Sequence, residues 1–75
     1  MNQIDFNEIL ISIENGQLKQ AVEQAVEQAN EYKLDYSSTK EYLEDYRTTY
    51  GVDYKKYSAL LWVFMYIFSK KEGKQ

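Results

Sequence analysis

The chain contains no cysteine, no histidine and no proline, and these absences exclude several kinds of protein. Without cysteine it can form no disulfide framework and no thiolate zinc site. Without histidine it lacks the residue that most often acts as a general base near neutral pH. It also has no glycine-rich phosphate-binding loop, and no histidine activates its serines. We therefore expect a protein that is not an enzyme and that has no cofactor and no metal site.

Residues that interrupt helices are scarce, because proline is absent and glycine occurs only at Gly16, Gly51 and Gly73. Such a composition favours helices. A chain of 75 residues fits one small domain with a thin core. We expect a single all-α domain over residues 1–75, in which residues 71–75 form a frayed tail.

Capping and spacing signals predict a compact bundle of about four short helices, at about residues 5–14, 17–34, 39–50 and 54–70. The sequence DFNE at residues 5–8 is typical of a capping box, in which Asp5 and Glu8 bond to each other's backbone. Asn15-Gly16 either ends the first helix in a left-handed conformation or turns a hairpin. The segment after Gly16 has no strand alternation, which favours the helix end.

The second expected helix contains the repeat AVEQAVEQ. Because the repeat is four residues long, about one helical turn, it places residues of the same type along one stripe of the helix. We expect a buried seam on this helix, where alanines let another helix approach closely. The seam consists of Leu18, Val22, Ala25, Ala29 and Tyr32.

The third helix is expected to begin with a capping box of Ser38 and Glu41 and to end at Gly51. Asp53 then caps the fourth helix. The apolar stripe of the third helix consists of Tyr42, Leu43, Tyr46 and Tyr50.

The fourth helix, within KKYSALLWVFMYIFSKK at residues 55–71, is apolar nearly all round. Its 13 apolar or weakly polar residues, 57–69, extend about 20 Å, which is too short to cross about 30 Å of hydrocarbon. We expect this helix to be the most apolar and the central one of the bundle, incompletely covered by its three short neighbours. The residues expected to serve self-association or partner binding are Trp62, Val63, Tyr66 and Ile67. The alternative interpretation is that the fourth helix is a core element that its neighbours cover completely. Whether Trp62 points into the core or outward stays open.

Charge is distributed unevenly along the chain, whose net charge is −3. Residues 1–50 carry ten carboxylates and four basic residues, whereas the remainder carries five lysines and two carboxylates. The residues of the expected acidic, partner-binding face are Glu23, Glu27, Glu31, Asp35, Glu41, Glu44 and Asp45. An ordinary solvated face is the alternative interpretation of this row.

These observations favour a protein–protein interaction module that acts as a stoichiometric inhibitor or adaptor. Its expected partner is a larger protein with a basic surface. A protein that handles nucleic acids is a candidate for this partner. In type, the chain resembles small acidic helical proteins of phages and mobile elements, including anti-CRISPR and other anti-defence proteins. The start of the chain lacks the features of a signal peptide, so we expect a cytoplasmic protein.

Two alternatives stay open. In the first, the chain is a helical module that binds nucleic acid through its tyrosines and through Lys55, Lys56, Lys70, Lys71 and Lys74. In the second, it is a structural subunit that self-associates through the fourth helix, as a homodimer or a trimer. The acidic total and the single arginine weigh against the first alternative.

Overall fold

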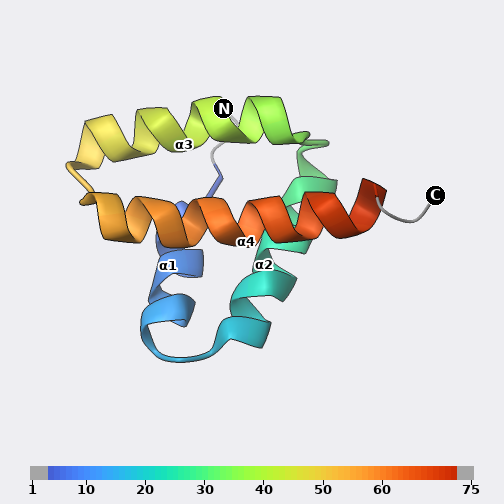
Figure 1. Ribbon diagram of the computed structural model, residues 1–75, viewed down its shortest axis with the longest axis horizontal. Helices are drawn as coiled ribbons and strands as arrows, with labels where there is room; N and C mark the ends of the chain where they lie inside the picture. Colours follow the sequence, from blue (N-terminus) through green and yellow to red (C-terminus); the bar gives the residue numbers. More distant parts are fainter. Residues whose placement is uncertain (1–3, 73–75) are drawn as a thin grey trace.

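The computed structural model describes residues 4–72, and it describes side chains over residues 4–70. Four helices follow one another: α1 (Phe6–Glu14), α2 (Leu18–Glu31), α3 (Tyr36–Tyr50) and α4 (Tyr54–Glu72). The all-α bundle predicted from the sequence is therefore confirmed. In Figure 1, α3 and α4 lie side by side as one helical hairpin, and the α1–α2 hairpin crosses it.

The start of α1 forms half of the predicted capping box. The Asp5 Oδ1 atom accepts a 3.0 Å hydrogen bond from the Glu8 backbone N–H. The Asp5 N–H, however, donates to the Gln28 Oε1 atom of α2 at 2.7 Å and not to Glu8. A side chain distant in the sequence thus satisfies this donor and ties the start of α1 to α2. At its other end, α1 stops at Asn15, and Gly16 adopts a φ of 76°, so the helix end is the correct alternative.

The connection between α2 and α3 differs from the prediction. The capping box expected from Ser38 and Glu41 is wrong, because Asp35 is the N-cap and Ser38 is its partner three residues later. The Asp35 Oδ1 atom accepts from the Ser38 N–H at 2.8 Å, and the Asp35 N–H donates to the Ser38 Oγ at 3.2 Å. α3 therefore begins at Tyr36, and α2 ends at Glu31, before Lys33 turns the chain with a φ of 54°.

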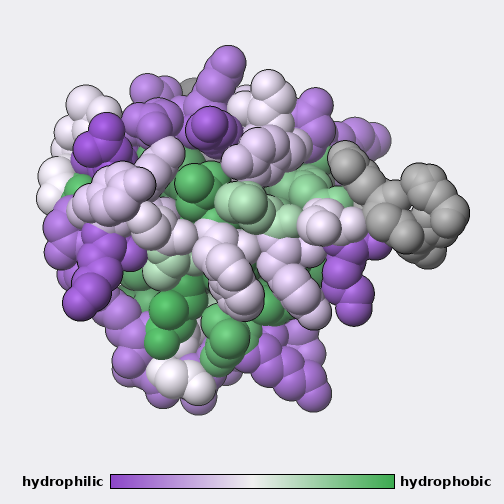
Figure 2. All heavy atoms as spheres, in the orientation of Figure 1, coloured by the Kyte–Doolittle hydropathy of each residue, from purple (hydrophilic) through white to green (hydrophobic). Residues whose placement is uncertain are grey.

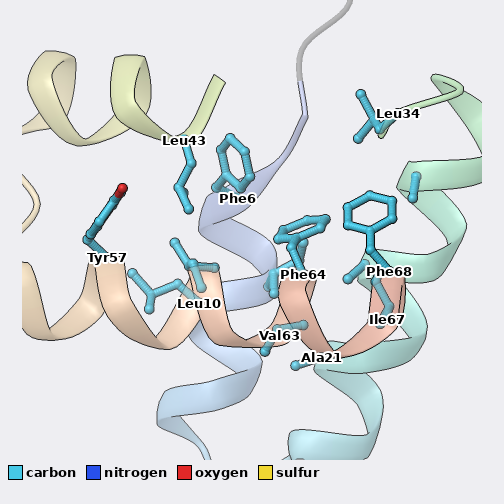
Figure 3. Packing of buried hydrophobic residues seen from close by; sticks show 14 residues of the cluster. Phe6, Leu10, Ala21, Leu34, Leu43, Tyr57, Val63, Phe64, Ile67 and Phe68 are labelled. Atoms are coloured by element: carbon cyan, nitrogen blue, oxygen red, sulfur yellow. The ribbon is translucent and has the colours of Figure 1, made fainter. Parts of the chain in front are cut away.

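The predicted central position of α4 is confirmed, because α4 packs against each of the other three helices, whereas α3 packs mainly on α4. Phe64 of α4 is fully buried, and its ring meets that of Phe6 edge to face at a centroid distance of 5.7 Å. Figure 3 shows side chains from all four helices and from Leu34 converging on this region. The buried apolar cluster consists of Phe6, Ile9, Leu10, Ala21, Ala25, Ala29, Leu34, Leu43, Tyr57, Leu60, Val63, Phe64, Ile67 and Phe68.

The buried seam of α2 is made of alanines. Ala21, Ala25 and Ala29, which follow one another at intervals of one turn, are all buried. The prediction was correct for Ala25 and Ala29 but wrong for Leu18, which is 45% exposed. Because alanine has a small side chain, the backbones of α1 and α4 can approach this stripe closely.

α4 extends to Glu72, two residues beyond its predicted end. Lys71 and Glu72 of the expected frayed tail are therefore helical, whereas residues 73–75 lie outside the described part of the chain. Over residues 4–72, none of the helices combines the length and the apolar character that crossing a membrane requires.

Candidate functional site

The outer side of α4 carries a group of exposed apolar side chains, which we call the aromatic patch: Trp62, Met65 and Tyr66. Their exposed fractions are 50%, 47% and 41%. The Trp62 and Tyr66 rings stack with centroids 5.7 Å apart and an interplanar angle of 14°. The Lys70 Nζ atom lies 5.7 Å from the centre of the Tyr66 ring, at the C-terminal end of the patch. The patch exists because α4 is apolar on all sides while its neighbours cover only one side.

The structure divides the four residues that were expected to form the apolar surface. Trp62 and Tyr66 are exposed, whereas Val63 and Ile67 are buried in the core and are not available to a partner in this fold. Val63 directly follows Trp62, and Ile67 directly follows Tyr66. Consecutive residues of a helix point about 100° apart, so the buried residues face the core while the exposed ones face outward. Met65 belongs to the exposed side and was missed, because residues 59–68 of α4 include no charged residue that would mark the outer face.

The space-filling view shows the face of the molecule over which α4 runs (Figure 2). Pale and green residues extend across the middle of this face, over α4 and down onto α1 and α2, and purple residues surround them. An apolar area bordered by polar residues is typical of an interaction surface.

The acidic residues predicted to form one face are distributed over separate surfaces. Glu23, Glu27 and Glu31 of α2 are exposed, and none forms an ion pair with the side chains described over residues 4–70. They lie on α2 opposite its alanine seam, at the spacing of one turn. Asp35 caps α3, and the Ser38 backbone N–H lowers the pKa of this carboxyl group.

The carboxylates of α3 point in different directions. Glu44 faces α4, where its Oε2 atom accepts a 2.6 Å hydrogen bond from the Tyr57 hydroxyl group and its Oε1 atom lies 3.3 Å from the Arg47 Nη2. The bond from Tyr57 is the main reason why the pKa of Glu44 is lowered. Glu41 is exposed, and Asp45 lines a groove next to α1. The seven residues therefore do not form one continuous acidic face, and Glu44 serves the packing of α3 on α4.

The groove next to Asp45 lies between α1 and α3 and was not predicted. Its aromatic wall consists of Tyr42, Tyr46 and Tyr50, and Asp5 and Asp53 join Asp45 in its lining. The repeat of tyrosine every four residues on α3 was the signal in the sequence. The tyrosine repeat alone does not reveal that α1 forms the other wall of the groove. The complete lining is Ile4, Asp5, Phe6, Asn7, Leu10, Tyr42, Asp45, Tyr46, Thr49, Tyr50, Gly51, Val52, Asp53 and Lys56.

The lysines of the nucleic-acid hypothesis are also divided. Lys55 and Lys70 are exposed on the same side of α4 as the aromatic patch, because they lie at helical spacing from Trp62 and Tyr66. The Lys56 Nζ lies 3.4 Å from the Glu14 Oε2, so this lysine forms an ion pair. The structure does not describe the side chain of Lys71, and Lys74 lies outside the described residues.

Among the described residues, no three carboxylates gather closely enough to hold a metal ion. Comparisons of the chain with models of known protein families, with curated proteins and with solved structures gave no match.

Proposed function

We propose that this chain is a non-enzymatic protein–protein interaction module and that the aromatic patch of α4 binds a larger protein. The exposure of the stacked Trp62 and Tyr66 rings beside Met65 is the observation that carries this proposal. Tryptophan and tyrosine supply large contact areas at a low cost in conformational entropy, and they are enriched among the residues that dominate binding energy.

The charges beside the patch favour a different protein over a second copy of this chain. Lys55 and Lys70 lie on the same side of α4, one before and one after the patch. In a two-fold dimer that pairs the two α4 helices, Lys55 of one copy lies toward Lys70 of the other if the helices run antiparallel, and toward the other Lys55 if they run parallel. Like charges placed opposite each other disfavour such an interface.

The acidic row of α2 supports a partner that also has a basic surface. Glu23, Glu27 and Glu31 are exposed and form no ion pair among the described residues. Such a row attracts a basic protein from a distance and orients it, an effect that salt weakens. For a module of this size without reactive groups, we propose the role of a stoichiometric inhibitor or adaptor. A cytoplasmic location is part of this proposal.

A second candidate function, binding of single-stranded nucleic acid, is favoured by one observation. The stacked Trp62 and Tyr66 rings lie beside Lys70, and rings next to a cation are the elements that hold stacked bases and their backbone. The net charge of −3 weighs against this function.

The test is affinity capture from the cells that produce the protein, followed by binding measurements with the purified partner. We expect Trp62→Ala to raise the Kd of the complex about thirtyfold, as for a residue that dominates an interface. Tyr54→Ala is the matched control, because Tyr54 is an exposed aromatic residue on α4 outside the patch. Equal affinity of the two variants contradicts the proposal. Salt-sensitive binding of a single-stranded oligonucleotide that Trp62→Ala abolishes would establish the second candidate instead.

A further inference from the structure

The groove between α1 and α3 combines aromatic rings with an excess of negative charge. The Tyr46 ring lies between those of Phe6 and Tyr50, each at a centroid distance of 5.2 Å, so the rings form a continuous wall. Tyr50 is 72% exposed, and Tyr42 is also exposed one turn before Tyr46. Their faces are therefore accessible to a ligand.

The carboxylates of the groove are not neutralised within the described part of the chain. Three aspartates line it, Asp5, Asp45 and Asp53, against the single cation Lys56, which is paired with Glu14. Asp5 and Asp53 each use one oxygen to cap a helix, accepting from the backbone N–H groups of Glu8 at 3.0 Å and of Lys56 at 2.9 Å. Asp45 forms no hydrogen bond or ion pair with the side chains described over residues 4–70.

We propose that this groove binds an arginine side chain of a partner polypeptide. A guanidinium group stacks on a tyrosine face and at the same time donates two parallel hydrogen bonds to a carboxylate, and the groove offers tyrosine faces and the Asp45 carboxylate. Tyr42, three residues before Asp45, is its neighbour on the surface of α3, and Tyr50 supplies a second exposed ring in the groove. Lysine fits this combination less well, because its ammonium group is compact and strongly hydrated. Three carboxylates repel an anionic ligand, and a purely apolar ligand that covered Asp45 would leave this carboxylate without a partner.

This inference goes beyond the proposed function, because the groove and the aromatic patch involve different residues. It rests on the proposed function only in assigning the arginine to a protein. The two can therefore be tested separately, the groove with a short peptide and the patch with the captured partner.

The probe is a capped tripeptide with a central arginine, titrated into the labelled full chain and followed by two-dimensional NMR. We expect the backbone amide signals of Asp45, Tyr46 and Gly51 to shift and to saturate, with a Kd on the order of 1 mM for so small a ligand. The same peptide with citrulline keeps the shape of arginine but lacks its charge, and we expect it to bind about tenfold more weakly. Shifts that are equal for the two peptides, or that are confined to the aromatic patch, overturn the inference.

Two pairs of variants locate the binding site. We expect Asp45→Asn and Tyr50→Ala each to weaken arginine binding about fivefold. Their controls are Glu41→Gln on the same helix and Tyr54→Ala, whose side chain is as exposed as that of Tyr50 but lies outside the groove. All four positions are exposed, so the fold should survive in each variant. Unchanged affinity in Asp45→Asn and Tyr50→Ala overturns the proposal, whereas Trp62→Ala should leave binding of this peptide intact.

Discussion

The Tyr57 hydroxyl group of α4 donates a 2.6 Å hydrogen bond to the Glu44 carboxylate of α3. The Arg47 guanidinium lies over the same tyrosine ring, with its Cζ atom 5.3 Å from the ring centre. Tyr57 therefore contacts one anionic and one cationic side chain of α3. Because α3 packs mainly on α4, this cluster lies in the interface that holds α3 in the bundle.

Replacing Tyr57 by phenylalanine tests the contribution of this hydrogen bond. We expect Tyr57→Phe to lower the free energy of unfolding by about 1 kcal/mol, which corresponds to a Tm lower by about 4–8 °C in a domain of this size. The hydroxyl of Tyr54 has no hydrogen-bond partner among the described residues, so Tyr54→Phe should leave the Tm unchanged. Thermal unfolding followed by circular dichroism measures both values. Identical Tm values for the two variants would show that the hydrogen bond does not stabilise the fold.

The same contact predicts how stability depends on alkaline pH. The hydrogen bond to Glu44, with burial, raises the pKa of Tyr57 from 10.0 to about 12. The folded state thus holds the phenol proton more tightly than the unfolded state does, and the stabilisation is complete below pH 10.0 and is lost as pH rises through about 12. Urea unfolding across this range should show a steeper loss for the natural chain than for Tyr57→Phe. Parallel curves would contradict the assigned cause.

The alanine seam of α2 should not accept a larger side chain. Ala25 is fully buried, so we expect Ala25→Leu to lower the free energy of unfolding by about 1–3 kcal/mol through overpacking. Val26 is the next residue and is exposed, and Val26→Leu should change stability by less than about 0.5 kcal/mol. Urea unfolding of both variants checks this difference. A stable Ala25→Leu variant would mean that the helices can move apart without cost.

Neighbouring positions on α4 should separate folding from binding. Phe64 is fully buried, and we expect Phe64→Ala to destabilise the fold by about 3–5 kcal/mol. Trp62 is half exposed, so Trp62→Ala should cost much less stability while it weakens partner binding. Urea unfolding provides the comparison. Equal destabilisation would indicate that Trp62 belongs to the core and not to a binding surface.

The sequence was sufficient to predict the helices and the central position of α4, because capping residues and apolar spacing are local signals. It was not sufficient to predict the outer side of α4. Trp62 and Val63 are adjacent and both apolar, and only the packing of the other helices decides that one is exposed and the other buried.

The sequence also failed to predict where α3 begins, because two possible N-cap residues lie close together there. Asp35 and Ser38 are both good N-cap residues, and the structure uses Asp35 as the cap and Ser38 as its reciprocal partner. The groove was beyond prediction for a different reason. Asp5 and Asp45 are 40 residues apart in the sequence, and only the crossing of the two helical hairpins brings them to the same groove.

The most direct test of the account uses Trp62, the single tryptophan of the chain, as a probe of the aromatic patch. Fluorotryptophan incorporated at this position gives one fluorine NMR signal, which can be followed while the purified partner is added. The account predicts that this signal shifts as Trp62 leaves water and that the shift saturates at a fixed stoichiometry. A signal that stays unchanged while light scattering shows the complex forming would contradict the claim that α4 carries the binding surface.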